Sequence, residues 1–326
     1  MRLNRIVTAG AAALAACGAL GMAPAAGQAS SASVPTWTQQ HPAVHPSARY
    51  GAVMAYDAAT GNAVLFGGLR PGNRGLDGDT WTWDGSTWTQ QHPAVHPSAR
   101  DGAAMAYDAA TGNVVLFGGL GSGGVILGDT WTWDGSTWTK QAPAAHPSAR
   151  DGAAMAYDAA TGNAVLFGGA NISRFFGDTW TWDGSTWTQQ APAAHPAVRD
   201  RPSMAYDAAT GNVVLFGGLG LPGADGDTWT WDGSTWTPQA PAAHPSAREG
   251  ASMAYDAATG NVVLFGGDDG GDTWTWDGST WTQQAPATSP TGRFGAVMAY
   301  DAATGNVVLF GGDSVNGFFH DTWTWG

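Results

Sequence analysis

Arginine, aromatic and acidic residues recur together at one position of this sequence, and these are residue types that bind ligands. Six arginines follow one another at intervals of 45 to 51 residues: Arg49, Arg100, Arg150, Arg199, Arg248 and Arg293. The residues directly after them are Tyr50, Asp101, Asp151, Asp200, Glu249 and Phe294. Guanidinium groups bind carboxylates, and aromatic rings stack on sugars or anchor a partner protein. We therefore expect binding chemistry at this position.

Two of these positions are aromatic, because Tyr50 and Phe294 replace the acids that the other four repeats carry. A variable segment near the C-terminus adds Phe318 and Phe319. The predicted ligand-binding residues are Tyr50, Phe294, Phe318, Phe319, Arg49, Arg293, Arg70 and Arg74. Aromatic rings beside arginine suit an acidic sugar or an acidic peptide. Two alternatives remain open: the repeated arginines pair with a neighbouring acid such as Asp79, and the phenylalanines pack back onto the protein.

The elements that must position these residues come from an internal repeat. The run Met-Ala-Tyr-Asp-Ala-Ala-Thr-Gly-Asn occurs six times, starting first at Met54 and last at Met298. Each copy continues into Val-Leu-Phe-Gly-Gly and Asp-Thr-Trp-Thr-Trp. A period near fifty with strand-like segments predicts a β-propeller. In the first repeat we expect strands over 51–56, 62–68, 80–83 and 86–90, with Asp84-Gly85 as a two-residue hairpin that places Trp81 opposite Trp88.

The two ends of the repeat array indicate how the ring closes. Residues 36–40 read as a fourth strand without the preceding three, and residues 321–325 as a third strand without a fourth. The predicted fold is therefore all-β: a six-bladed β-propeller over 36–326, with four antiparallel strands per blade and the N-terminal strand completing the last blade. The 18 tryptophans could form sugar platforms, but their regular spacing favours packing between blades.

The repeat resembles a known family. A double glycine follows the apolar strand (Gly67-Gly68), tryptophans follow at Trp83 and Trp88, and Arg100 opens the next repeat, which is similar to the kelch repeat over residues 36–326. Trp83 stands where the kelch repeat usually has tyrosine. The resemblance implies a fold similar to the central domain of galactose oxidase, and a binding platform for proteins or carbohydrates more often than an enzyme.

Galactose oxidase-type copper radical chemistry needs a Cys–Tyr cofactor, and Cys17 is the only cysteine of the chain. Since Cys17 lies in a predicted export segment, that chemistry is excluded for the mature chain. The repeated histidines, such as His45 and His96, occur one per blade and cannot converge on one metal. We predict no catalytic residues, no metal and no cofactor. The expected function is an exported binding module for a protein or carbohydrate; the alternative is a glycan-acting enzyme using Arg and acidic residues of the loop face.

Residues 1–29 have the features of a signal peptide, followed by a short linker over 30–35. Arg2 and Arg5 form a basic start, and residues 6–22 are apolar. This predicts a secreted, extracellular bacterial protein without a membrane span. Leu14-Ala15-Ala16-Cys17 also resembles a bacterial lipobox, so a cell-surface lipoprotein anchored at Cys17 is the alternative.

The charge balance excludes one class of partner. Lys and Arg total 13 against 26 Asp and Glu, which gives a net charge of −13. Nucleic-acid binding needs a basic surface, so we expect no nucleic-acid partner. We also expect a monomer.

Overall fold

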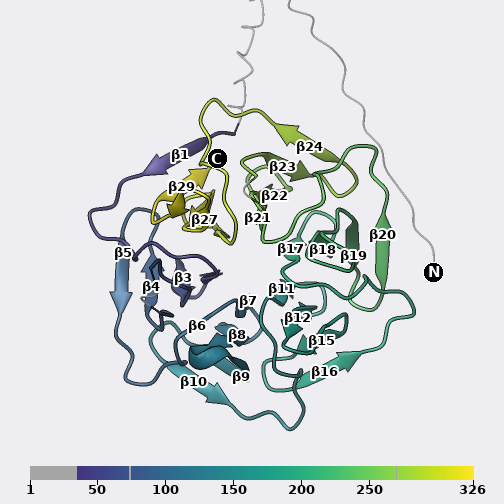
Figure 1. Cartoon of the computed structure of the whole chain (residues 1–326), viewed down its shortest axis with the longest axis horizontal. Helices are drawn as coiled ribbons and strands as arrows, with labels where there is room; N and C mark the ends of the chain where they lie inside the picture. The colour runs from purple at the N-terminus through teal and green to yellow at the C-terminus, as the bar shows by residue number, and fades with distance from the viewer. Residues whose placement is uncertain (1–34, 73–74, 269) are drawn as a thin grey trace, which may run out of the picture. The chain divides into compact units, whose positions relative to one another are not determined.

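Six four-stranded antiparallel sheets follow one another around a ring in the computed structural model (Figure 1). The structure describes residues 35–72, 75–268 and 270–326. Each sheet is one blade, and it runs from a first strand near the ring axis to a fourth strand at the rim (Figure 1). The prediction of an all-β, six-bladed propeller is confirmed. The predicted signal peptide, the lipobox at Cys17 and all but the last residue of the linker lie outside the described residues.

The blades have these strands. Blade one comprises β2 (Val53–Asp57), β3 (Asn62–Phe66), β4 (Thr80–Trp83) and β5 (Trp88–Gln91). Blade two comprises β7 (Ala104–Asp108), β8 (Asn113–Gly121), β9 (Val125–Trp133) and β10 (Trp138–Gln141), with β6 (Arg100–Asp101) added beside β8 and the 3-10 turn η1 (Ser122–Gly124) between β8 and β9. Blade three comprises β11 (Ala154–Asp158), β12 (Asn163–Phe167), β15 (Thr179–Trp182) and β16 (Trp187–Gln190).

Blade four comprises β17 (Ser203–Asp207), β18 (Asn212–Phe216), β19 (Thr228–Trp231) and β20 (Trp236–Gln239). Blade five comprises β21 (Ser252–Asp256), β22 (Asn261–Phe265), β23 (Thr273–Trp276) and β24 (Trp281–Gln284). Blade six comprises β25 (Val297–Asp301), β26 (Asn306–Phe310), β29 (Thr322–Trp325) and β1 (Trp37–Gln40). Two short hairpins lie in the loops between second and third strands: β13 (Ala170–Asn171) with β14 (Arg174–Phe175), and β27 (Asp313–Ser314) with β28 (Gly317–Phe318).

The N-terminal strand closes the ring as predicted. β1 pairs antiparallel with β29, so that Trp37 lies opposite Trp325 and Gln40 opposite Thr322. Blade six is therefore built from the two ends of the described chain, and β1 covers the strand edge that β29 would otherwise expose.

Tryptophan side chains pack between neighbouring blades. Trp83 and Trp88 of blade one are each 1% exposed and share a cluster with Val308 and Phe310 of blade six. The other blade junctions repeat this arrangement. The second strand of each blade is apolar at every interior position because it is buried on both faces. The packing interpretation of the tryptophans is confirmed.

One hydrogen bond between buried side chains recurs at each junction between a blade and the blade before it. The indole nitrogen of the fourth-strand tryptophan donates to a buried threonine of the preceding blade, at 2.8 to 2.9 Å. The pairs are Trp37 to Thr273, Trp88 to Thr322, Trp138 to Thr80, Trp187 to Thr130, Trp236 to Thr179 and Trp281 to Thr228. This set of six hydrogen bonds is complete only because the N-terminal strand β1 supplies Trp37.

The register of the third hairpin differs from the prediction. Trp83 lies opposite Trp88, so Asp84 to Thr87 form a four-residue loop where a two-residue turn was expected. The Asp84 carboxylate accepts hydrogen bonds from the amides of Ser86 and Thr87 at 2.9 and 2.7 Å, which stabilises the longer loop. Trp83 and Trp88 still share a face, because directly opposite residues of an antiparallel pair lie on the same side.

The turns at one end of the blades are nearly identical, whereas the loops at the other end vary. In blade one Asp57 accepts hydrogen bonds from the amide of Ala59 and the hydroxyl of Thr60, so this repeated acid stabilises a turn. The variable loops and the connections between blades lie at the opposite end. Over the residues that the structure describes, no helix is long and apolar enough to cross a membrane.

Candidate functional site

A closed circle of backbone hydrogen bonds surrounds the ring axis on the variable-loop side. It is formed by the second residue after each repeated arginine, whose amide donates to the carbonyl of the equivalent residue in the preceding blade at 2.7 to 3.2 Å. The donor and acceptor pairs are Gly51 to Gly295, Gly102 to Gly51, Gly152 to Gly102, Arg201 to Gly152, Gly250 to Arg201 and Gly295 to Gly250. Five of the six residues are glycines with φ of 61 to 64°, a region that side chains disfavour.

Arg201 is the exception in this circle. It holds φ at 48° where the other blades have glycine, and this left-handed conformation costs a residue with a side chain on the order of 1 kcal/mol. Its guanidinium lies 3.2 Å from Asp200, 3.8 Å from Glu249 and 3.9 Å from Asp151. The side chain is 34% exposed. A strained residue on an otherwise regular frame marks this position as a candidate for function.

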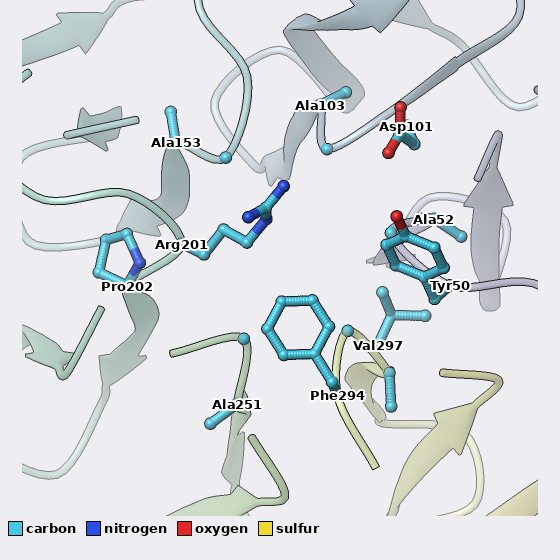
Figure 2. A pocket seen from close by; sticks show the side chains of 16 residues that line it. Tyr50, Ala52, Asp101, Ala103, Ala153, Arg201, Pro202, Ala251, Phe294 and Val297 are labelled. Atoms are coloured by element: carbon cyan, nitrogen blue, oxygen red, sulfur yellow. The ribbon is translucent and has the colours of Figure 1, made fainter. Parts of the chain in front are cut away.

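A hollow of about 120 Å³ lies beside this circle, and Tyr50, Asp101, Arg201 and Phe294 are among the residues that line it (Figure 2). The residues just before the circle divide into an acidic sector and an aromatic sector. Blades two to five present the acids Asp101, Asp151, Asp200 and Glu249, and blades six and one present Phe294 and Tyr50. Figure 2 shows the Arg201 guanidinium, Asp101, Tyr50 and Phe294 around one opening. The hollow lies at the centre of the ring because every blade contributes to its lining.

The predicted aromatic cluster is present in part at the junction of blades six and one. The ring of Tyr50 lies 6.2 Å from Phe294 and 5.5 Å from Phe318, measured between centroids. Phe319 instead lies 4.0 Å from the guanidinium of Arg293 and covers it. Tyr50 and Phe294 line the hollow, and Phe318 extends the aromatic surface outward from Tyr50.

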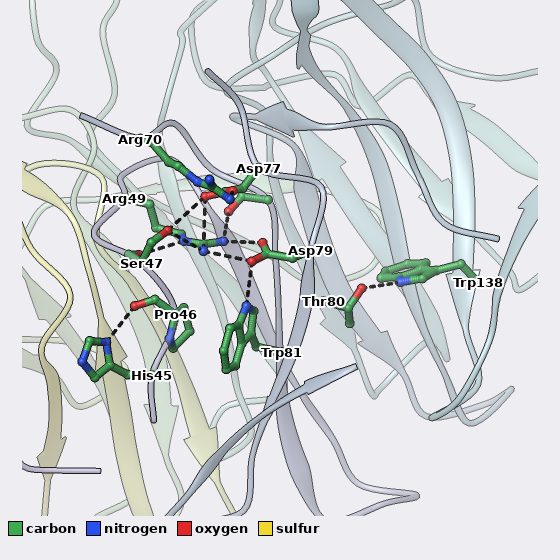
Figure 3. A network of polar contacts seen from close by, with 11 residues as sticks. His45, Pro46, Ser47, Arg49, Arg70, Asp77, Asp79, Thr80, Trp81 and Trp138 are labelled. Carbon is green, nitrogen blue, oxygen red and sulfur yellow. Dashed lines mark hydrogen bonds and ion pairs between the residues drawn. The ribbon is translucent and has the colours of Figure 1, made fainter. Parts of the chain in front are cut away.

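The predicted arginines occupy other places. Arg49 and Arg293 are each 1% exposed and neither lines the hollow. Arg49 binds Asp79 with both terminal nitrogens, at 2.6 and 3.1 Å, and also the carbonyl of Gly67 (Figure 3). Arg293 binds Asp321 in the same way. Their guanidiniums therefore hold the loops of their own blades together, which was the alternative interpretation.

Of the two remaining predicted arginines, Arg70 does not line the central hollow. Arg70 pairs with Asp77, which also contacts Arg49 at 3.2 Å (Figure 3). Arg74 lies outside the described residues. Arg201 was not among the residues predicted from the sequence to bind a ligand, although the structure places it at the axis. Alignment of the six repeats would have found it, because it alone replaces a glycine at this position.

Burial changes the acidity of the central carboxyl groups. Burial raises the pKa of Asp101 to about 6, with Arg201 opposing and Asp151 reinforcing the shift. Burial likewise raises the pKa of Asp200 to about 6, where Arg201 again lowers it and Asp151 and Glu249 raise it. The pKa of Asp151 and of Glu249 is also raised by burial. At neutral pH Asp101 and Asp200 are therefore mostly ionised, and they become partly neutral as the pH falls through 6.

The repeated histidines lie in the connections between blades and make local contacts. Nδ1 of His45 lies 2.9 Å from the carbonyl of Pro46, and the same contact recurs at His96, His146, His195 and His244. The ring of His45 stacks on His320 at 4.7 Å. Within residues 35–72, 75–268 and 270–326, no group of three or more His, Cys, Asp or Glu side chains could hold a metal ion.

Comparison with known proteins supports the fold alone. No protein-family model matches the chain, and no curated protein sequence matches it. Among solved structures, the one titled "Structure of YjhT" superposes with a TM-score of 0.66 at 15% sequence identity. The match covers 86% of this chain and 95% of that one. The chain thus has a structural neighbour across nearly the whole propeller, and this likeness shows the fold alone.

Asp101→Asn is expected to stabilise the protein at pH 7.5. Because the folded-state pKa is about 6 and the unfolded value is near 4, the folded state binds this proton more tightly. The contribution of Asp101 to the free energy of unfolding therefore falls as pH rises from about 4 to 6. Asparagine does not titrate, so the variant does not lose this stability. We expect a gain on the order of 1–3 kcal/mol above pH 6.5 and almost none at pH 4, measured by thermal unfolding.

Asp84→Asn is the opposite control for this experiment. Although burial raises the pKa of Asp84, the hydrogen bonds from Ser86 and Thr87 outweigh it and lower the pKa. The variant should therefore lose stability at pH 7.5. If Asp101→Asn also melts lower at pH 7.5, the carboxylate is not a source of strain in the folded ring.

Proposed function

We propose that this protein is an exported binding module that holds a protein or carbohydrate ligand over the hollow at the ring centre. One observation carries the proposal: at the axis, six nearly identical blades carry different side chains. Tyr50 and Phe294 stand where the other blades have acids, and Arg201 accepts a strained backbone where they have glycine. A regular frame with irregular residues at one place is the usual arrangement of a binding site on a scaffold.

The lining suits recognition because it combines flat rings with ionised groups. Tyr50 and Phe294 supply aromatic surface, and Asp101 and Arg201 supply an acceptor and a donor beside it. Export, as predicted from residues 1–29, is part of the proposal and would place this site outside the cell.

Replacing Tyr50 and Phe294 together by Asp is expected to abolish ligand binding and preserve the fold. Asp101, Asp151 and Asp200 occupy the equivalent positions in other blades, so the frame accepts acids there. The measurement is binding of labelled protein to an array of immobilised glycans and peptides, followed by the affinity of each positive spot.

The matched control is Ile172→Asp, which changes a side chain that is 98% exposed on another variable loop. It should bind as the parent protein does. Full affinity of the Tyr50→Asp, Phe294→Asp double variant for an array ligand would place the site elsewhere on the propeller.

A glycan-acting enzyme is the second candidate, and the acidity of Asp101 and Asp200 favours it. Carboxyl groups with a pKa of about 6 beside a hollow can exchange protons near neutral pH. Release of reducing ends from a panel of polysaccharides, compared between the parent and an Asp101→Asn, Asp200→Asn variant, separates this activity from binding.

A further inference from the structure

The hollow carries an excess of negative charge. Asp101 is the acid that lines it and, within the described part of the chain, Arg201 is the one cation that lines it; Asp151, Asp200 and Glu249 lie within 4 Å of the Arg201 guanidinium. Arg201 already faces three of these carboxylates at 3.2 to 3.9 Å. Three negative charges therefore remain uncompensated when all four acids are ionised. An incoming anion would meet this excess, whereas an incoming cation would neutralise it.

Among these four acids, Asp101 is the one that forms no ion pair with a described residue, although its carboxylate accepts a hydrogen bond from the Asp101 backbone. Asp101 is 5% exposed and lines the hollow. Its Oδ1 also has no hydrogen-bond partner. A buried carboxylate in this condition is costly unless a donor reaches it. A hydrogen-bond donor on a bound ligand would remove this cost.

Aromatic rings stand next to the Asp101 carboxylate. The hydroxyl end of Tyr50 points toward Asp101, and the ring of Phe294 lies on the other side of the opening (Figure 2). Guanidiniums lie over phenylalanine rings at several places in this protein: Arg150 at 3.9 Å from Phe176, Arg293 at 4.0 Å from Phe319 and, in the hollow itself, Arg201 at 5.7 Å from Phe294. A cation next to Asp101 could make the same contact with the rings of the hollow.

We propose that the hollow binds the cationic tip of a lysine or arginine side chain from a peptide ligand, with Asp101 as its acceptor. The inference rests on the proposed function and names the chemical class of its ligand. A volume of about 120 Å³ favours a narrow head group on a flexible stem over a rigid sugar ring with its hydroxyls. The net charge of −13 would also draw a basic partner toward the protein.

The test compares two probes of nearly equal shape. Nα-acetyl-arginine amide carries a guanidinium, and Nα-acetyl-citrulline amide carries a neutral urea in its place. Titration calorimetry or NMR at pH 7.5 should find the arginine probe bound at least tenfold more tightly. Asp101→Asn should remove that preference, with folding verified by its melting temperature.

Arg201→Gly gives an expectation of opposite sign. Glycine is the residue of the other five blades, so the backbone of the circle accepts it. Because the variant removes the resident cation, the arginine probe should bind several-fold more tightly. If Arg201 itself held an anionic ligand, an acidic peptide or acidic sugar from the array would bind the parent and be lost in this variant, and the proposal would fall.

Acidification provides a further readout. Asp101 faces Tyr50 of blade one, Asp151 of blade three and Arg201 of blade four, and its pKa is about 6. Binding of the arginine probe should therefore weaken several-fold between pH 7 and pH 5, while binding of the citrulline probe should stay constant.

Three further results would overturn the inference. They are equal affinity for the two probes, no binding of the arginine probe at millimolar concentration, and preference for glucosamine over both the arginine probe and N-acetylglucosamine. The last result would assign the cation to an amino sugar. In each case the proposed function stands if the Tyr50→Asp, Phe294→Asp variant loses an array ligand, and it fails separately if that variant binds normally.

Discussion

Deletion of residues 36–40 is expected to unfold or aggregate the protein, because β1 supplies the fourth strand of blade six. Trp37 is 0% exposed and packs against Phe265 and Trp325, with ring centroids 5.2 and 5.4 Å away. Loss of a buried tryptophan costs about 3–5 kcal/mol, to which the lost strand pairing adds. We expect the melting temperature to fall by roughly 10 °C or more, if soluble protein is recovered at all.

Two single substitutions distinguish the contribution of the strand pairing from the contribution of the side chains. Gln39→Ala alters an exposed residue of the same strand and should leave the melting temperature unchanged. Trp37→Ala keeps the strand and removes the hydrogen bond to Thr273. Its melting temperature should therefore lie between those of the Gln39→Ala variant and the deletion variant. A deletion variant that melts with the parent protein would contradict closure through β1.

The frame could be predicted from the sequence because the repeat displays its own boundaries. The incomplete runs at residues 36–40 and 321–325 fit only a shared blade, and β1 pairs with β29 accordingly. The hairpin register could not be predicted as well. Asp-Gly is a strong two-residue turn signal, but Asp84 also accepts bonds from Ser86 and Thr87, and those side-chain contacts select a loop of four residues.

The candidate site was predicted in outline. Ring closure made Tyr50 and Phe294 neighbours, which needs only the order of the blades. The choice of arginines depended on the direction in which each side chain points, and the amino-acid composition does not determine this direction. Arg49 turns into its own blade toward Asp79, whereas Arg201 lies at the axis because it belongs to the hydrogen-bonded circle. Arg201, and not Arg49 or Arg293, is therefore the arginine beside the aromatic rings that line the hollow.

Arg150→Met is expected to destabilise the protein by about 3–5 kcal/mol, as loss of one partner of a buried ion pair does. The Arg150 side chain is 0% exposed and binds Asp178 at 2.7 and 3.0 Å and the carbonyl of Gly168 at 2.9 Å. Methionine fills part of the volume but donates to neither acceptor, so the Gly168 carbonyl loses the Arg150 hydrogen bond and Asp178 loses both bonds from Arg150 but keeps the bond from Trp180. Denaturant unfolding at pH 7.5 measures the loss.

The exposed Arg174 is the matched control, since it stacks on the same ring, Phe176, as Arg150 does. Arg174→Met should change stability little. Burial alone would raise the pKa of Asp178, but the hydrogen bonds and charge of Arg150, with the bond from Trp180, hold it below its ordinary value. The stability that this ion pair contributes is therefore full above pH 4 and is lost as the pH falls below 4. The free energies of unfolding of the parent protein and of the Arg150→Met variant should therefore converge in acid. An equal deficit at pH 7.5 and at pH 3 would mean that packing, and not the ion pair, makes Arg150 necessary.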